Sequence, residues 1–511
     1  MKEEILLGGG LNAYNPEIVV EKGEVVWGSK NFYFERGVAR SRDGLSALPA
    51  AYIPASLSAG LFRFGKPFKV QASASSTTDW GAVVMYGNGA IGFDDGSGSL
   101  TLLYPASGTD TSDGISPLCG MAQCDMVNGS ILVGGYTTGL RRWVADHSGP
   151  FTTTRIAAAP YRYVAGHRTR AIAAYALPAS GAPTVNPRKV AWSVDGDETN
   201  FTSAGSGSTT LADSAGEITG VAVIRDTLVV ARSDGFTFGY LTGSSSPVYN
   251  WLTHSKNSIG CTEASTFAYD SNACYFVSND DVYRFDLVDM VKIGQKAQPK
   301  ITRRYDSNSQ TLLYCGFIAE SSGNGANLQE QFPCRRYHLI SNQATGISHF
   351  AYDIDEERWS YHDYDDVTLG GYFNGTMTLI AFYDGAVGTE TVSYFNSETA
   401  CERGGVLKTP VVILGDPDSN TTVQGMSLEY NNKDGSAIDC TVDVDSTADG
   451  PDLLEREGAI SLFPNSGWRR GKIGLRSSGN YVQTTITVPA NHHLELSRLR
   501  VQYEPTGEQR T

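Results

Sequence analysis

The feature that most constrains the fold of this chain is a hairpin phrase that returns along most of its length. In each copy an apolar stretch leads into a short polar turn, and a second apolar stretch follows, as in two antiparallel strands. The copies are centred on Asn88, Asn128, His167, Asp226, Asn272, Asn308 and Asn374. Their spacing of about 40 residues is the size of a propeller blade. The sequence therefore predicts a β-propeller of six or seven blades, with a pair of β-sandwiches as the alternative that spacing leaves open.

Two neighbouring copies show the repeating unit most clearly. The segments that begin at Glu217 and Glu263 each have the pattern strand, turn, strand, turn, strand. Their second turns, Ser233-Asp234-Gly235 and Asn279-Asp280-Asp281, are expected to reverse the outer hairpin of a blade. A small sheet of this kind cannot bury both faces alone, so radial stacking of neighbours is the expected solution.

Changes in strand length and composition along the sequence divide the chain into three parts. Residues 1–45 predict extended strands that close the ring or pair with another subunit. Residues 46–400 form the predicted propeller, with an insertion near 178–216 where Ser, Gly and Pro are frequent. Residues 401–511 have longer alternating strands and predict a separate antiparallel β-sandwich.

Composition supports an all-β protein and argues against a general nucleic-acid binder. The chain has 56 Gly, 26 Tyr and 20 Phe and only 19% charged residues, as expected for short strands joined by tight turns. Its formal net charge of -15 opposes tight binding to phosphates. The start, MKEEILLGGG, lacks a signal peptide's basic and apolar regions, and no apolar run is long enough to span a membrane. We therefore expect a soluble protein that assembles in the cytoplasm.

The cysteines predict neither a metal site nor a disulfide framework. The eight are dispersed along the chain, and only Cys119 and Cys124 are close, at a spacing that matches no zinc or redox pattern. We expect reduced core residues at Cys119, Cys124, Cys261, Cys274, Cys315, Cys334, Cys401 and Cys440.

Several motifs resemble functional sites but favour turns instead. The stretch from Gly87 to Gly92 matches GxGxxG, but strand and turn follow it where a dinucleotide site needs a helix. The segment Ser193–Thr199 is close to the Asp-box of sialidase-like propellers, which is a turn staple. Asp416 and Asp418, and Asp443 and Asp445, do not fit a dedicated calcium loop and predict surface turns.

No catalytic set can be assigned from the sequence. A glycoside hydrolase would need two convergent carboxylates, for which Asp79, Asp195, Glu198 and Asp213 are candidates, and turn roles explain them better. No HExxH, P-loop or GxSxG motif occurs, and the histidines are scattered except for His492-His493, expected in a turn. We therefore predict no catalytic, metal or cofactor residues.

Four arginine doublets each lie beside an aromatic residue. They are Arg141-Arg142, Arg303-Arg304, Arg335-Arg336 and Arg469-Arg470, next to Trp143, Tyr305, Tyr337 and Trp468. This pattern fits either DNA contact with base stacking or ion pairs with acidic residues of a neighbouring subunit. The acidic surplus of the chain favours subunit contacts.

In order along the chain, five phrases resemble a family of phage tail proteins. They are the opening GGGLNAYNPEIVVEKGEVVWGSKNFYFERGVARSRDGL, RKVAWSVDGDETNF, the pair of blade units from Glu217 and Glu263, HFAYDIDEERWSYHDY, and the close GWRRGKIGLRSSG with LSRLRVQYEPTG. The chain resembles the tail nozzle, tubular tail and packaged-DNA-stabilising hub proteins of podovirus-like bacteriophages.

The resemblance implies a virion tail protein that forms a hexameric ring beneath the portal and adaptor. Its partners would be further copies of itself, adaptor and fibre or spike proteins, and genomic DNA in transient, non-specific contact during retention and ejection. No enzyme activity is expected. The alternatives are a propeller-type carbohydrate-active enzyme and a receptor-binding adhesin of the tail.

Overall fold

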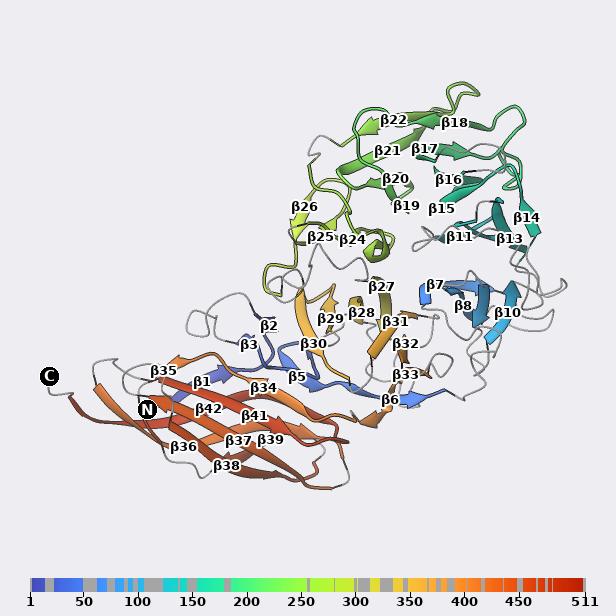
Figure 1. The fold of residues 1–511 in the computed structure, drawn as a ribbon. Helices are drawn as coiled ribbons and strands as arrows, with labels where there is room; N and C mark the ends of the chain where they lie inside the picture. The colour runs from blue at the N-terminus through green and yellow to red at the C-terminus, as the bar shows by residue number, and fades with distance from the viewer. Residues whose placement is uncertain are drawn as a thin grey trace.

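A computed structural model of the chain describes most of its residues. The described ranges are 2–13, 23–48, 62–70, 79–86, 91–94, 100–104, 123–136, 138–144, 154–178, 185–254, 258–279, 281–297, 301, 313–321, 334–342, 348–364, 367–373, 378–383, 391–400, 402–414, 419–434, 436–447, 454–465, 467–473, 477–479 and 481–508. The fold is all-β, with a β-propeller and a C-terminal antiparallel β-sandwich (Figure 1).

The propeller contains seven four-stranded antiparallel sheets among the described residues, and we number these blades 1–7 in chain order. Blade 1 comprises β7 (Phe62–Val70), β8 (Asp79–Tyr86), β9 (Ile91–Asp94) and β10 (Leu100–Tyr104). Blade 2 comprises β11 (Cys124–Val127), β12 (Ser130–Val133), β13 (Leu140–Val144) and β14 (Thr154–Ile156). Blade 3 comprises β15 (Tyr161–His167), β16 (Arg170–Ala176), β17 (Asn186–Trp192) and β18 (Gly207–Thr210). Blades 4 and 5 comprise β19 (Ile218–Ile224), β20 (Thr227–Arg232), β21 (Gly235–Leu241), β22 (Tyr249–Thr253); and β23 (Ala268–Tyr269), β24 (Cys274–Val277), β25 (Val282–Phe285), β26 (Met290–Lys292). Blades 6 and 7 comprise β27 (Leu313–Ser321), β28 (Cys334–Asn342), β29 (Ser348–Asp353), β30 (Arg358–His362); and β31 (Val367–Phe373), β32 (Thr378–Tyr383), β33 (Thr391–Ala400), β6 (Asp43–Ala47).

The ring is closed by strands that are far apart in the sequence. The N-terminal strand β6 pairs with β33 and is the outermost strand of blade 7. The first strand of that blade, β31, lies beside β7, the first strand of blade 1. This arrangement leaves the propeller without an open edge between its first and last blades.

The hairpin phrases mark the start of most blades. Five of the seven predicted turn centres lie at the turn between the first two strands of a blade, and three of these turns have left-handed residues, at Asn128, at Arg168, and at Arg225 and Asp226. Asn88 falls instead between β8 and β9, the second and third strands of blade 1. Asn308 is different, because it lies outside the described residues and precedes β27, whose hairpin partner begins at Cys334. The segment near 178–216, expected as an insertion, contains β17 and β18 and so supplies the two outer strands of blade 3.

The sandwich is built from both ends of the chain. Its larger sheet contains β1 (Lys2–Leu6), β4 (Phe32–Glu35), β5 (Val38–Ser41), β36 (Ser419–Asn432), β39 (Arg469–Ile473), β40 (Ser477–Ser478) and β42 (Leu494–Glu508). The smaller sheet contains β34 (Gly405–Lys408), β35 (Val412–Ile413), β37 (Ile438–Thr447), β38 (Leu454–Leu462) and β41 (Tyr481–Val488). A short parallel pair, β2 (Leu11–Asn12) and β3 (Val25–Val26), lies in the connection between β1 and β4.

The sequence pattern explains why the two domains differ. In β37 the residues Cys440, Val442 and Val444 are fully buried, whereas the residues between them face outward, as in a sheet with one wet face. In β12 and β24 every residue is buried, because a blade packs against a neighbour on each side. Burial of one such large apolar side chain stabilises the fold by about 1.5–3 kcal/mol.

Candidate functional site

The four candidate carboxylates are not brought together as a catalytic pair. Glu198 of blade 3 accepts hydrogen bonds from Asn128, Ser130 and Arg142 of blade 2. Burial opposes ionisation of Glu198, but these bonds and the Arg142 charge hold its pKa below its usual range. Its contacts tie two blades together.

The other three candidates have separate structural roles or undescribed side chains. Asp195 accepts a hydrogen bond from the Thr169 hydroxyl in the same blade. Asp213 pairs with the buried Arg232 of blade 4, Oδ1 to Nη1 2.6 Å. Asp79 begins β8, and its side chain lies outside the described residues. The described contacts therefore assign blade-joining or turn roles to three of the four.

The predicted turn motifs have mixed outcomes. The strands on either side of the GxGxxG stretch, β8 and β9, pair antiparallel, and residues 87–90 between them lie outside the described ranges. In the Asp-box-like segment Asp197 accepts the backbone N–H of Thr199 at 3.0 Å, as a turn staple does. The expected turn at Asp443 and Asp445 is wrong, because both residues lie within β37. Asp416 and Asp418 lie outside the described residues.

The described cysteines are buried and are not in disulfides. Cys124, Cys261, Cys274 and Cys440 have no disulfide partner, and burial raises the pKa of Cys261 and Cys440 to about 12. The other four cysteine side chains, at positions 119, 315, 334 and 401, lie outside the described residues. In the described part of the chain no group of three or more His, Cys, Asp or Glu residues is placed to hold a metal ion.

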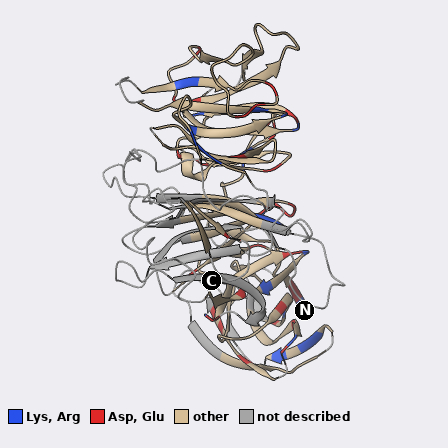
Figure 2. Ribbon diagram, turned by 90° about the vertical axis from the view of Figure 1, so that its right-hand side faces the viewer, with Lys and Arg blue, Asp and Glu red and all other residues tan. Residues whose placement is uncertain are grey.

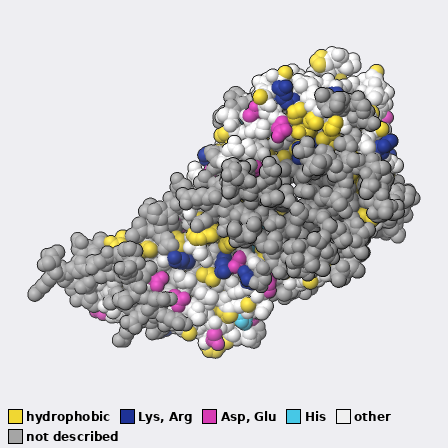
Figure 3. Space-filling view, in the orientation of Figure 1, with side chains coloured by type: hydrophobic (Ala, Val, Ile, Leu, Met, Phe, Trp, Pro, Cys, Tyr) yellow, Lys and Arg dark blue, Asp and Glu magenta, His cyan; other side chains and the backbone are white. Residues whose placement is uncertain are grey.

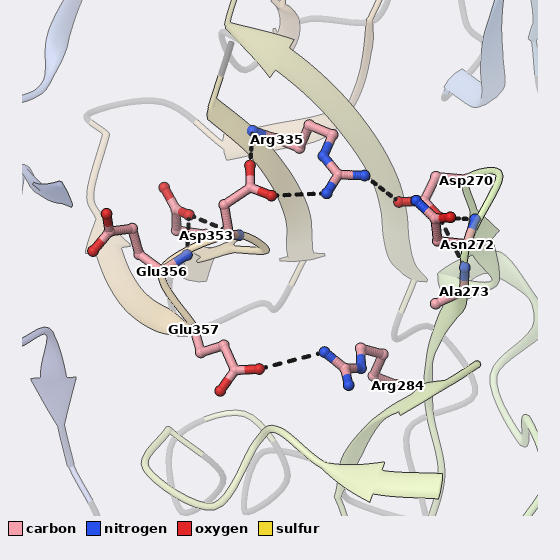
Figure 4. A network of polar contacts seen from close by, with 9 residues as sticks. Asp270, Asn272, Ala273, Arg284, Arg335, Asp353, Glu356 and Glu357 are labelled. Atoms are coloured by element: carbon pink, nitrogen blue, oxygen red, sulfur yellow. Dashed lines mark hydrogen bonds and ion pairs between the residues drawn. The ribbon is translucent and has the colours of Figure 1, made fainter. Parts of the chain in front are cut away.

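Arg335 joins blades 5 and 6 (Figure 4). Its guanidinium lies between two carboxylates, with Nη1 3.0 Å from Asp270 of blade 5 and Nη2 2.7 Å from Asp355 of blade 6. A second link, from Arg284 to Glu357 at 3.3 Å, crosses the same seam. The described contacts of Arg335 therefore join neighbouring blades, and a subunit contact at this arginine stays a prediction.

The remaining doublets separate into internal and exposed pairs. Arg142 pairs with Glu198 at 2.9 Å, and Arg141 is buried over the ring of Tyr136. Arg469 and Arg470 are exposed on β39. Arg303 and Arg304 lie outside the described residues.

Side chains cross the axis of the propeller between blades that are not neighbours. The Gln123 side-chain oxygen, just before blade 2, accepts the backbone N–H of Val221 in blade 4 at 3.0 Å. Asp125 of blade 2 accepts hydrogen bonds from the backbone of Gly166 in blade 3 and from the Tyr269 hydroxyl in blade 5. Where Gln123 and Asp125 make these contacts, the described residues fill the propeller axis, so a DNA duplex cannot pass along it.

The junction between the propeller and the sandwich contains a fully buried arginine. Arg42 has no exposed side-chain surface, and its Nη2 lies 2.5 Å from Glu402 Oε1. Its guanidinium also lies 4.9 Å from the centre of the Tyr364 ring. The arginine therefore links the N-terminal segment to residues that follow blades 6 and 7.

Two further ion-pair groups fix the same junction. Arg336 of β28 pairs with Glu35 of β4, and its guanidinium lies 3.9 Å above the Tyr33 ring. Asp363, just after blade 6, accepts contacts from Lys30, Asn31 and Arg403. Burial opposes ionisation of Asp363, but these contacts hold its pKa below the usual range.

Three histidines of blade 6 meet beside these ion pairs. His338, His349 and His362 come from β28, β29 and β30, and each is at most 3% exposed. His338 Nδ1 lies 2.8 Å from His349 Nε2, and His349 Nδ1 lies 2.6 Å from the Tyr364 hydroxyl. His362 packs on His349 and on Tyr33, with ring centres 5.1 and 4.7 Å apart.

Burial keeps this group of histidines neutral. It lowers the pKa of His338 and His362 well below the usual value, and lowers that of His349 to about 3. Neither ring nitrogen of His362 has a hydrogen-bond partner among the described residues. The histidines were expected to be scattered, and only the strand register of blade 6 would have placed His349 opposite His362. The expected position of His492 and His493 is correct, since both precede β42 in a connection.

The surface is mixed in charge where it is described. Charged residues are spread along the strands and turns of both domains (Figure 2), and a group of hydrophobic side chains lies over the blades at the top of Figure 3. No helix in the described ranges is long and apolar enough to cross a membrane.

Comparisons with known proteins find no sequence match and only distant structural likenesses. No protein-family model and no curated protein sequence matches the chain. Among solved structures, the β-propeller domain of Cps50 (Swd1) from Myceliophteria thermophila has 9% identity and a TM-score of 0.40, covering 66% of this chain and 97% of that one. BamB from Moraxella catarrhalis has 10% identity and a TM-score of 0.33, covering 65% and 96%. The acylaminoacyl peptidase of Pyrococcus horikoshii has 11% identity and a TM-score of 0.35, covering 71% and 60%. The strand pairing itself makes this chain a β-propeller protein with a C-terminal sandwich, and these likenesses say nothing of what it does.

Proposed function

We propose that this protein is a structural component of a bacteriophage tail, the nozzle or hub ring through which the genome is retained and ejected. The five sequence phrases that resemble such proteins support the proposal, and the fold suits a mechanical role. We expect six copies in the ring, with adaptor and fibre or spike proteins as partners, and assembly in the host cytoplasm before incorporation into the virion.

One observation carries the mechanical argument: the N-terminal segment is part of both domains. Strands β1, β4 and β5 belong to the larger sandwich sheet, and β6, which follows at once, completes blade 7. Buried Arg42 and the Asp363 contacts fix this segment on both sides. A load applied to one domain therefore reaches the other through paired strands rather than through a flexible linker.

The filled axis determines where DNA would travel. Because Gln123 and Asp125 contact blades across the propeller axis, the conduit would lie between copies, with each propeller as a part of the wall. An acidic chain is suited to this wall, since it repels phosphates and lets DNA slide.

The test is to image the purified full chain by negative-stain electron microscopy, alone and with its neighbouring tail proteins. Closed rings with a central opening are expected. A chain that stays monomeric with its tail partners would contradict the proposal. Release of sugar from host surface glycan, or binding to it, would instead support the enzyme or the adhesin.

A further inference from the structure

Two neighbouring rows on the outer face of the larger sandwich sheet, together called the basic face, are rich in cations, although the chain has a formal net charge of -15. Residues opposite one another in an antiparallel sheet share a face. The register places two rows side by side on this face, Arg470–Glu429–Arg498 and Lys472–Ser427–Arg500–Glu4. The two rows therefore contain four cations and two carboxylates.

Half of these cations are already neutralised within the chain. Arg498 pairs with Glu4 and Glu429, and Arg500 lies 3.4 Å from Glu4. Arg470 and Lys472 are exposed, and neither side chain makes an ion pair or hydrogen bond with a described residue. They lie on β39, which pairs along the sheet only with β36 among the described strands.

An exposed aromatic side chain lies at the start of the same strand. Trp468, directly before β39, is 44% exposed. Arginine and tryptophan are both enriched at protein interfaces. The edge of the basic face thus has the composition of a contact surface.

The outer face of the smaller sheet has the opposite charge. Asp439, Asp443 and Asp445 lie on the outer side of β37, because Cys440, Val442 and Val444 between them are fully buried. On the neighbouring strand β38, Glu457 and Glu455 occupy the register positions opposite Asp443 and Asp445. A cationic surface placed over this row of aspartates would be attracted to their negative charge.

The two charged faces are on opposite sides of one sandwich. The buried residues of both sheets form a single core, so the outer faces point away from each other. When one copy's basic face meets the next copy's acidic face, every contact has the same head-to-tail geometry. Contacts of this kind close into rings or extend into filaments.

Resting on the proposed ring, we infer that neighbouring copies associate through their sandwiches, with the basic face of the larger sheet on the acidic face of the smaller sheet. Opposite charges at such a contact fix the orientation and register of the partners. The association should weaken as salt rises, because the outer pairs are screened.

Charge reversal on one face at a time tests the inference. The variant Arg470→Glu/Lys472→Glu has two acidic faces, and Asp439→Lys/Asp443→Lys/Asp445→Lys has two basic faces. Each variant alone should lose self-association by about 100-fold or more, because like charges would meet. Mixed in equal amounts, they should form rings in which the two variants alternate, and mass photometry and native mass spectrometry would detect a one-to-one composition.

Matched controls separate this contact from general charge effects. Lys189→Glu/Arg225→Glu makes the same change in net charge on blades 3 and 4 and should leave the rings intact. If either reversed variant fails to fold by circular dichroism, Arg470→Ala/Lys472→Ala and Asp443→Asn/Asp445→Asn replace them, with a smaller loss of association expected from each.

The outcomes distinguish the inference from the proposed function. Rings of the unaltered chain that persist in both reversed variants would overturn the sandwich contact and leave the ring itself standing. A chain that never forms rings would overturn both. Variant rings that persist but bind a short DNA duplex more weakly would assign the basic face to DNA and overturn the contact between copies.

Discussion

Aromatic side chains pack together in two regions of the molecule, but the residue types differ between the two. In the seam between blades 4 and 5, the Phe236 ring lies 4.6 Å from Phe285 and 5.2 Å from Phe276, centre to centre. In the junction between blade 6 and the N-terminal strands, the rings belong to histidines and tyrosines, with Arg42 and Arg336 among them.

The difference shows which part of the protein depends on charge. Apolar rings in the seam contribute much the same stability at any moderate pH, since none of them titrates. The junction depends on neutral histidines and on paired arginines, and either can be changed by a proton or by a single substitution. The seam between blades 4 and 5 should therefore outlast the junction under mild acid.

Acidification should give the largest effect, and it should act on the junction. The unfolded chain binds protons at its histidines near pH 6.5, whereas folded His349 does so only near pH 3. Stability is therefore lost as pH falls through this window. Between pH 7 and pH 5 His349 alone accounts for about 2 kcal/mol, and His338 and His362 act in the same direction. Urea unfolding at several pH values would measure the slope.

Removing one histidine should reduce that slope. His362→Phe is the best variant, because neither nitrogen of His362 has a described partner and its ring packs on Tyr33. His493→Gln, in the connection before β42, is the control and should keep the full slope. His167, whose pKa burial also lowers, adds to the slope in all variants. Equal slopes in His362→Phe and the unaltered chain would show that the group does not govern acid stability.

Loss of Arg42 should be the next largest effect. Arg42→Ala removes a fully buried guanidinium, its ion pair with Glu402 and its contact with the Tyr364 ring. We expect a loss of about 3 kcal/mol in the free energy of unfolding, since buried pairs are costly to break from one side. Denaturant unfolding followed by fluorescence would measure it, because Trp27 and Trp359 lie in this region. A loss below about 1 kcal/mol would mean that the strand pairing alone holds the junction.

The sequence was sufficient for the propeller because its signals are local. Hairpin turns such as Asn128-Gly129 and Arg225-Asp226 need only adjacent residues, and they mark the first two strands of a blade. The longer alternation after residue 400 likewise predicts the sandwich strands β36, β37, β41 and β42.

The junction could not be predicted, because it joins residues that are far apart in the chain. The contacts of Arg42 with Glu402 and of Glu35 with Arg336 depend on the pairing of strand β6 with blade 7. Asp443 and Asp445 show a different failure. Their Asp-rich sequence favours a turn, but the alternating valines are buried and hold the segment as a strand.

The seam between blades 5 and 6 is intermediate, because its arginine is charged like those of the junction but is partly exposed. Arg335→Ala removes contacts to Asp270 and Asp355, with the arginine side chain 28% exposed. We expect a loss of about 1–2 kcal/mol, smaller than for Arg42, because water already competes for this arginine. Parallel denaturant curves for the two variants would measure the difference. If Arg335→Ala cost as much as Arg42→Ala, burial would not be what distinguishes the two sites.

The smallest effect is expected from the second arginine on that seam. Arg284 has nearly the same exposure as Arg335, 27%, but its partner Glu357 is 67% exposed and is its one ion-pair partner among the described residues. Since exposed ion pairs contribute little, Arg284→Ala should cost less than about 0.5 kcal/mol. Raising the salt concentration should reduce even that. Because the two arginines share a seam and an exposure, the pair of variants isolates the number and burial of the carboxylate partners. A loss for Arg284→Ala equal to that for Arg335→Ala would show that the arginine stems, packed along the seam, stabilise it more than their charges do.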